Sequence, residues 1–132
     1  MISAIRHTLK AYERLKREQH INTLFRNGKA YSFFPLRLLF LRAARPATEE
    51  APVRAGFSVP KKKFRKAVHR NRIKRLMREA WRLNKQNIYE VVAKDEQLHL
   101  FFIFTATELP EYAVVEAAMK KAIEKVSKDL QL

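Results

Sequence analysis

Apolar residues alternate with polar or small ones in two stretches of this chain. In residues 53–59, VRAGFSV, every second side chain from Val53 is apolar, and those between are small or polar. Residues 36–41, LRLLFL, place Phe40 on the same side as Leu36 and Leu38, and Arg37 on the other side with Leu39 and Leu41. A period of two is that of a β-strand, so both stretches are predicted to be strands.

A third stretch is apolar almost without interruption. Residues 98–106, LHLFFIFTA, carry the strongest strand signal of the chain. A continuous apolar run is typical of a strand that is covered on both faces. We therefore expect this segment to be a central strand buried on both sides.

Helical spacing marks the remaining segments. Residues 18–27 are predicted to form a short helix that buries Ile21, Leu24 and Phe25 and stops at Gly28. From Pro110 to the end of the chain, apolar residues again recur at helical spacing, with lysines between them. The order of helix, strands, helix, strand and helix predicts an α+β or α/β sandwich with a small sheet.

The most pronounced helical pattern lies in residues 65–85. Its apolar residues fall at i, i+3, i+4, i+7 and i+8, which is one side of an α-helix: Ile73, Leu76, Met77, Ala80 and Trp81. The opposite side is polar and basic, with Asn71, Arg75, Arg78 and Arg82 at its centre and Arg72 and Lys74 beside them. One side of this helix is therefore expected to pack on a core and the other to meet a partner.

Charge indicates the class of that partner. Residues 54–85 contain thirteen lysines or arginines and a single acid, Glu79, which gives +12 of the net charge of +15. An ordinary solvated helix face mixes signs so that neighbouring charges can pair, and this one does not. A polyanion explains the excess. An anionic membrane surface would require Trp81 and its neighbours to be exposed, whereas the flanking strands offer them a core, so we expect nucleic acid and no membrane contact.

The segment before the basic helix indicates which nucleic acid, DNA or RNA, the helix would bind. Residues 60–66, PKKKFRK, form a basic loop that runs into the helix, so its lysines and the first helical amides can address the same phosphates. A DNA-binding helix-turn-helix would need a partner helix at this place, and a strand closed by Pro60 occupies it instead. We therefore expect RNA rather than DNA.

Catalytic chemistry is absent from the sequence pattern. The histidines at 7, 20, 69 and 99 do not have metal-ligand spacing, there is no cysteine, and no glycine-rich phosphate loop or acidic cluster occurs. We expect no protein metal site and no catalytic residue in the chain itself. The absence of cysteine and of an apolar leader segment is typical of a soluble cytoplasmic protein.

These residues resemble a known family. The segment GFSVPKKKFRKAVHRNRIKRLMREAWR, residues 56–82, is similar to the signature of the bacterial ribonuclease P protein component. The resemblance extends to RLKREQHINTLFRNG, residues 14–28, and to the strand at 36–41. Beyond residue 85 it rests on pattern only.

The resemblance implies both a fold and a function. The fold would be a single domain over residues 1–132 with the order αβββαβα, in which 1–13 form a flexible extension. Its small, mostly antiparallel sheet of about four strands would contain a left-handed βαβ crossover, as in the second domain of ribosomal protein S5. The protein would be the small subunit of a ribonucleoprotein that removes the 5′ leader from precursor tRNA, with hydrolysis carried out by the RNA subunit and its Mg²⁺. Composition alone permits an alternative, a ribosomal or general RNA-binding protein.

The resemblance also assigns two surfaces. The helix would bind the ribonuclease P RNA through Arg70, Asn71, Arg72, Lys74, Arg75, Arg78 and Arg82, since guanidinium groups suit bidentate phosphate contacts. Asn71 could instead be a helix cap, and Arg70 falls near the edge of the apolar stripe. A cleft between the first helix and the sheet would hold the precursor's leader through Phe25, Phe40, Arg17, Arg37, Ser58, Lys61 and Lys62. Phe25 could instead be a core residue, and Ile21 stands where the family often has phenylalanine.

Overall fold

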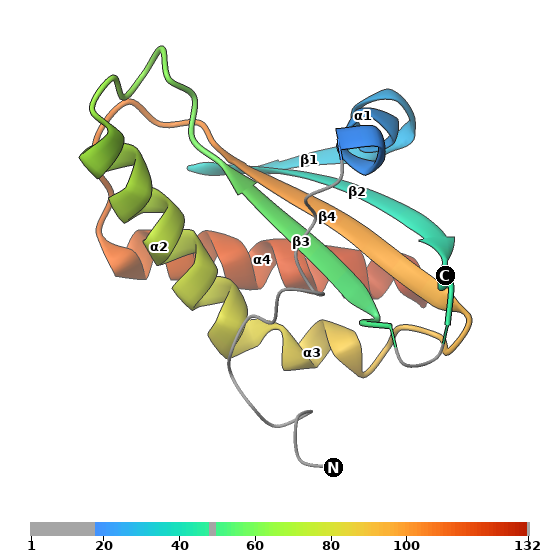
Figure 1. The fold of residues 1–132 in the computed structure, drawn as a ribbon. Coiled ribbons are helices and arrows are strands. Elements are labelled where there is room, and N and C mark those ends of the chain that lie inside the picture. The colour runs from blue at the N-terminus through green and yellow to red at the C-terminus, as the bar shows by residue number, and fades with distance from the viewer. Residues whose placement is uncertain (1–17, 48–49, 132) are drawn as a thin grey trace.

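The computed structural model describes residues 18–47 and 50–131 of the chain (Figure 1). The elements in chain order are α1 (Glu18–Asn27), β1 (Lys29–Phe33), β2 (Leu36–Ala44), β3 (Val53–Ser58), α2 (Ala67–Asn84), α3 (Gln86–Tyr89), β4 (Glu96–Phe104) and α4 (Tyr112–Leu130). Within the described residues, no helix is both long enough and apolar enough to cross a lipid bilayer.

The four strands form one mixed sheet in the order β1-β2-β4-β3. β1 pairs antiparallel with β2 and β2 pairs antiparallel with β4, whereas β3 and β4 are parallel. A parallel pair requires a crossover, and here α2 and α3 provide it. The predicted α/β sandwich with a small, mostly antiparallel sheet and a βαβ unit is therefore confirmed, with the short helix α3 added to the predicted order.

The helices cover the two faces of the sheet unequally. α2 and α4 lie side by side against one face, and α1 lies against the other (Figure 1). The large core forms between the sheet and the α2–α4 layer. Among the described residues, the buried hydrophobic cluster on the α1 side consists only of Leu24 and Leu39. In the described part of the chain, α1 is the one helix on this face, and its ten residues leave Ser32 and Arg37 of the sheet exposed.

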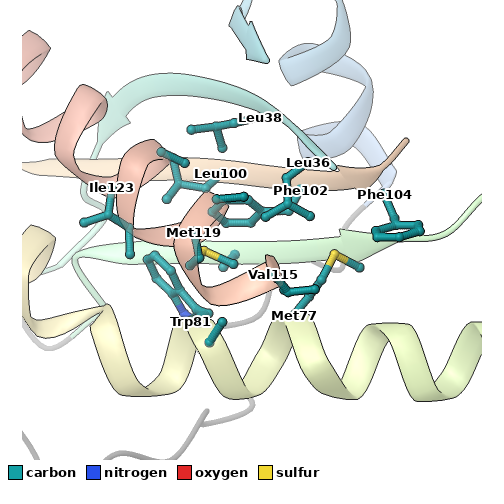
Figure 2. Close-up of a cluster of buried hydrophobic side chains, with 14 of the residues drawn as sticks. Leu36, Leu38, Met77, Trp81, Leu100, Phe102, Phe104, Val115, Met119 and Ile123 are labelled. Atoms are coloured by element: carbon teal, nitrogen blue, oxygen red, sulfur yellow. The ribbon is translucent and has the colours of Figure 1, made fainter. Parts of the chain in front are cut away.

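The apolar stripe of the basic helix packs as predicted. Ile73, Met77, Ala80 and Trp81 of α2 are buried, and Leu76 is partly buried against the same core. Figure 2 shows Trp81 beside Met119 of α4 and below Phe102 of β4, and the rings of Trp81 and Phe102 are 5.9 Å apart. With this side of α2 fixed in the core, the arginine side must face outward.

Two sequence predictions about burial are wrong. β4 was expected to be buried on both faces, but Phe101 and Ile103, which point toward the α1 side, are only partly buried. Phe25 was expected to be buried by the first helix, but 55% of its surface is exposed. Both differences have one cause, the small area that α1 covers.

Two short elements were not predicted from their residues. β1, KAYSF, is an edge strand with a largely exposed pattern, and its Tyr31 packs on Phe40 with a ring separation of 5.7 Å. α3 follows α2 after one residue and buries Ile88. Neither segment is long enough for its own periodicity to define it, so tertiary contacts decide its structure.

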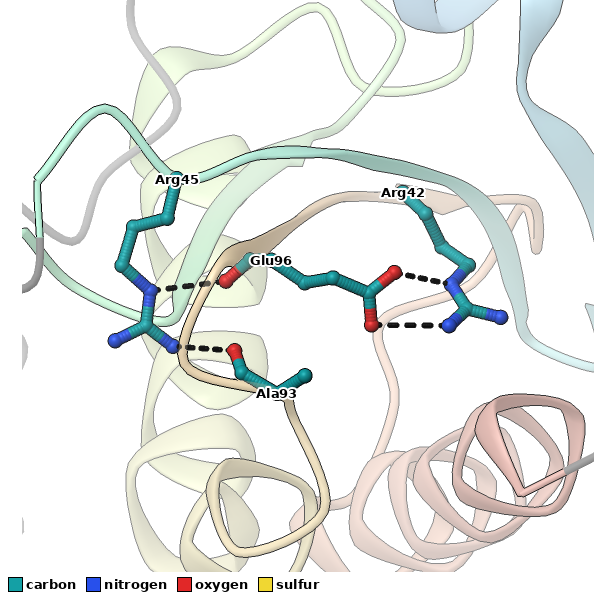
Figure 3. A network of polar contacts seen from close by, with 4 residues as sticks. All are labelled: Arg42, Arg45, Ala93 and Glu96. Carbon is teal, nitrogen blue, oxygen red and sulfur yellow. Dashed lines mark hydrogen bonds and ion pairs between the residues drawn. The ribbon is translucent and has the colours of Figure 1, made fainter.

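The start of the connection between β2 and β3 is fixed by a polar network (Figure 3). Arg42 forms two hydrogen bonds with the carboxylate of Glu96, at 2.8 and 2.9 Å. Arg45 donates to the carbonyl oxygens of Glu96 and Ala93, at 2.9 and 3.0 Å. The network ties the end of β2 to the turn before β4 and so holds this end of the two central strands together.

Candidate nucleic-acid interface

The outward side of α2 is a basic surface that begins in the helix's first turns. Asn71, Arg72, Arg75 and Arg78 are exposed, and Lys74 is partly buried. Val68, His69, Asn71, Arg72 and Arg75 line a shallow hollow on this side. The exposed guanidinium groups beside this hollow are suited to phosphate contacts.

Asn71 is not a helix cap. The residue at the N-terminal boundary of α2 is Lys66, with extended backbone angles and no capping hydrogen bond from its side chain. Asn71 lies one turn into the helix and its side chain is exposed. Of the two interpretations of this residue, the structure removes the cap.

Arg70 has a different position from the other basic residues of α2. It is partly buried, and its Nη1 donates to the carbonyl oxygens of Phe64 and Arg65, each at 2.8 Å. These are backbone groups of the 60–66 loop, so Arg70 holds the loop against the helix. Arg70 thus has a role in positioning the basic loop, and its direct contact with RNA stays a prediction.

One of its own side chains, that of Phe64, also fixes the 60–66 loop to the core. Phe64 is buried and packs on Phe104, with ring centroids 5.8 Å apart. The loop's cations are all exposed: Lys61, Lys62, Lys63, Arg65 and Lys66. An ordered backbone thus carries five exposed cations beside the first turn of α2, where the helix macrodipole adds positive potential.

Arg82 differs from the arginines near the start of α2 because it is paired. Its guanidinium forms a short ion pair and a second hydrogen bond of 3.2 Å with Glu79 on the same helix. The hydrogen bond from Arg82 lowers the pKa of the Glu79 carboxyl and raises the pKa of Arg82. The single acid of α2 therefore offsets charge near the end of the helix, and the positive surface is concentrated toward its start.

The open face of the sheet beside α1 forms a second surface. Phe25 is exposed there and meets Phe101 of β4 edge to face, with ring centroids 5.7 Å apart. The next row of residues on this face, two positions along β4 from Phe101, crosses all four strands. From β1 through β2 and β4 to β3 it consists of Ser32, Arg37, Ile103 and Ser58. Ser32 and Arg37 are exposed, and Ile103 and Ser58 are partly buried. The result is a floor with an apolar centre and polar ends, which matches an unpaired nucleic-acid strand.

The other predicted residues of this cleft fall in different places. Lys61 and Lys62 are exposed in the 60–66 loop, which follows Ser58 closely in the chain. Phe40 lies on the opposite face, in the large core, where it stacks on Tyr31. Its burial argues against direct contact with a ligand in the cleft. Arg17 lies outside the described residues.

Phe101 and Ile103 are cleft residues that the sequence analysis did not identify. In a continuous apolar run, no polar neighbour shows which residues share a face. Their pairing supplies that information, because Phe101 is opposite Leu39 and Ile103 is opposite Arg37. The alternation of β2, read through this register, would have placed both on the α1 side.

The same face ends in a hollow of mixed polar and apolar lining at the other end of the sheet. Its lining includes Thr23 of α1, and its floor is formed by adjacent residues of three strands, Leu41, His99 and Arg54. Gln97 donates through Nε2 to the carbonyl of Ala51 at 2.8 Å, which leaves its Oε1 to accept from His99 Nε2 at 2.9 Å. These bonds orient the buried imidazole. Among the described residues, no group of three or more histidine, cysteine, aspartate or glutamate side chains could hold a metal ion.

Comparison of the sequence with known proteins gives a consistent result. The family model described as Ribonuclease P matches residues 9–127. A ribonuclease P protein component from Porphyromonas gingivalis is 38% identical over 131 residues, which cover 96% of this chain and 92% of that protein. A ribonuclease P protein component from Chlorobaculum tepidum is 45% identical over 76 residues, which cover 52% of this chain and 49% of that protein.

Solved structures share the fold. The ribonuclease P protein of Staphylococcus aureus superposes with a TM-score of 0.67 at 22% identity, covering 90% of this chain and 97% of that one. The ribonuclease P protein of Thermotoga maritima also gives a TM-score of 0.67, at 23% identity, with 86% and 96% covered. At these identities the similarity concerns the arrangement of helices and strands.

Proposed function

The chain belongs to the ribonuclease P protein family and is the protein subunit of ribonuclease P, and we propose that it contacts two RNAs through two separate surfaces. The basic side of α2 with the 60–66 loop would bind the ribonuclease P RNA. The open face of the sheet beside α1 would bind the 5′ leader of precursor tRNA. The loop, which borders both surfaces, would place the two RNAs next to each other.

The geometry of α2 supports the first contact. Its buried side leaves Arg72 and Arg75 exposed at the helix start, where the hollow and the positive end of the macrodipole also lie. Arginine suits this position because its planar guanidinium makes two parallel hydrogen bonds to one phosphate. Such contacts depend on charge and shape, which fits binding to a folded RNA.

The observation that carries the second contact is the row Ser32, Arg37, Ile103 and Ser58, which crosses the whole sheet. The row ends at Ser58, and the loop with the exposed Lys61 and Lys62 follows it in the chain. Aromatic side chains stack on unpaired bases without requiring a particular sequence, and Phe25 with Phe101 provides such a platform. A subunit that serves many precursors requires this tolerance. The cations at the end of the row would hold the leader's backbone.

The phosphodiester hydrolysis is proposed to belong to the RNA subunit. Mg²⁺ would act through phosphates of that RNA. The protein's own residues would bind and position: α2 fixes the subunit on the catalytic RNA, and the sheet holds the leader in a fixed direction. Holding the leader in place raises the effective concentration of the cleavage site at the catalytic RNA.

The direct test is cleavage of a 5′-extended precursor tRNA by a bacterial ribonuclease P RNA at low Mg²⁺, with and without the protein. Cleavage at the mature 5′ end that depends on the protein is the expected result. An absence of stimulation, with a folded protein and a matched RNA, would contradict the proposed roles of the two surfaces. It would favour a general RNA-binding protein instead.

A further inference from the structure

Phe34 is the most exposed large apolar residue in the described part of the chain, with 77% of its surface accessible. It stands in the turn between β1 and β2, and its neighbour Pro35 is buried. No packing role in this structure accounts for an aromatic ring at this position. An exposed aromatic ring on a fixed backbone is the arrangement that proteins use to stack on unpaired bases.

The turn is tied to the end of the sheet. The carbonyl oxygen of Pro35 accepts two hydrogen bonds from Thr105, one from its backbone nitrogen at 2.8 Å and one from its hydroxyl at 3.0 Å. Pro35 directly precedes β2 and Thr105 directly follows β4, so these bonds extend the pairing of the two strands and fix the turn. The backbone that carries Phe34 is thus ordered although the ring itself is exposed.

The same residue connects the turn to the basic loop. The ammonium group of Lys63 donates to the carbonyl oxygen of Thr105. Thr105 therefore bonds with Pro35 on one side and with Lys63 on the other, and it brings the Phe34 turn and the 60–66 loop to one end of the sheet. Figure 1 shows the β1–β2 turn and the segment after β3 at this same end.

This end of the sheet borders the proposed leader cleft. The row that crosses the four strands begins at Ser32 and Arg37, and the turn that carries Phe34 lies between these two residues in the chain. A strand of RNA lying along the row, with its phosphates on Lys61 and Lys62, would leave the sheet beside this turn. The ring would then meet a base that has no pairing partner.

We propose that Phe34 is an additional stacking site for an unpaired base of the precursor's 5′ leader, where the leader leaves the row Ser58–Ile103–Arg37–Ser32. The proposal rests on leader binding by the open sheet face. The occupant is the leader rather than the ribonuclease P RNA, because the row is continuous with the turn and because stacking requires a base that is not already paired. The exposed cations of the loop supply the matching charge for its backbone.

The test uses the holoenzyme assembled from the protein and its ribonuclease P RNA, and it measures affinity for two precursors. One carries a long single-stranded leader and the other a leader of a single nucleotide. Phe34→Ala is expected to weaken binding of the long-leader precursor by at least about fivefold, the lower range for one base–aromatic stack. Binding of the short-leader precursor and of the RNA subunit should not change.

Two further variants separate stacking from other effects. Phe34→Tyr keeps the ring and should retain affinity, whereas Phe34→Leu keeps apolar volume without a ring and should behave as Phe34→Ala does. Val114→Ala removes another exposed apolar side chain, on α4, and should leave both precursors unaffected. Because Phe34 is so exposed, thermal unfolding of all four variants should match that of the unaltered protein.

The outcomes distinguish this proposal from the function on which it rests. If the unaltered holoenzyme does not discriminate between the two precursors, leader binding itself is wrong and this inference falls with it. If it does discriminate and Phe34→Ala discriminates equally well, only the stacking site is wrong. If Phe34→Ala weakens binding of both precursors equally, or weakens binding of the RNA subunit, Phe34 contacts RNA other than the leader. Either result would also overturn the proposal.

Discussion

The phenol of Tyr31 donates a short hydrogen bond to the carboxylate of Asp129, across 98 residues of sequence. The contact joins the edge strand β1 to the last turn of α4. Lys125 of α4 completes it, with its ammonium nitrogen 3.6 Å from the carboxylate and 5.2 Å from the centre of the tyrosine ring. Edge strands have unpaired backbone groups on one side, so a contact of this kind helps to hold β1 in the sheet.

This contact predicts how stability depends on pH. The hydrogen bond from Tyr31 lowers the pKa of the Asp129 carboxyl, and the same bond raises the pKa of the Tyr31 phenol. The contribution of Asp129 is complete above its unfolded pKa of about 3.9 and is lost as pH falls through the lower folded value. The contribution of Tyr31 is complete below about pH 10 and is lost as pH rises through its raised value.

Tyr31→Phe should therefore lower the free energy of unfolding at neutral pH and reduce its loss at acid pH. Urea unfolding between pH 3 and pH 7, at about unit intervals, measures both effects. Glu124→Gln, which removes an exposed carboxyl from the same helix, should keep the acid dependence of the unaltered protein. Identical pH profiles for Tyr31→Phe and the unaltered protein would contradict this account.

Gly28 is required where α1 meets the sheet. A Cβ at this position would lie 2.5 Å from the carbonyl oxygen of Leu24 and 3.0 Å from that of Phe40. Both are backbone atoms, so relief would require the last turn of α1 to change its backbone conformation and to move away from β2. Gly28→Ala should cost about 1–3 kcal/mol of unfolding free energy, measured by denaturant unfolding, while Lys29→Ala at the exposed next position serves as the control. An equal effect for both variants would show that the close approach is not the cause.

Truncation of Met77 would leave a cavity under the basic helix and so lower the free energy of unfolding. Its side chain is fully buried between the sheet and the α2–α4 layer. Met77→Ala should lower the unfolding free energy by about 2–5 kcal/mol. Leu83→Ala, also on α2 but with 43% of the residue exposed, should change it by only about 0.5 kcal/mol. Similar losses in the two variants would mean that α2 does not pack by its predicted stripe.

Arg75 and Arg82 provide a matched pair for the RNA interface. Arg75 is exposed beside the hollow near the start of α2, whereas Arg82 is already paired with Glu79. If Arg75 contacts a phosphate of the ribonuclease P RNA, Arg75→Ala should reduce the slope of log affinity against log salt by about one unit. Arg82→Ala should reduce it less. Titrations at several salt concentrations measure the slopes, and an unchanged slope for Arg75→Ala would remove this residue from the interface.

Much of the fold could be predicted from the sequence because the decisive signals are local. The alternation in residues 36–41 correctly places Phe40 with the leucines at 36 and 38, all of them in the core. The apolar stripe from Ile73 to Trp81 likewise identifies the buried side of α2. Each pattern depends only on the geometry of its own element, which neighbouring residues determine.

The sequence predicted less well which residues of the candidate sites are exposed at them. Arg70 and Arg75 are both arginines in the first half of α2. Arg70 is bonded to the backbone of the basic loop, whereas Arg75 is exposed. Phe25 and Phe40 were both predicted to line the cleft, and only Phe25 is on the open face. Charge and residue type indicated a binding surface in each case, without indicating which member of the set reaches it.

Periodicity thus predicted which residues share a side, and the run of arginines and lysines indicated the kind of partner. Only the tertiary structure decided which side of the sheet is open, which arginine is already bonded and where Phe34 stands relative to the basic loop. The physical reason is that these properties depend on contacts between segments far apart in the chain. Thr105 bonding to Pro35 and Lys63, and α1 covering only part of one face, are not encoded in the period of any single element.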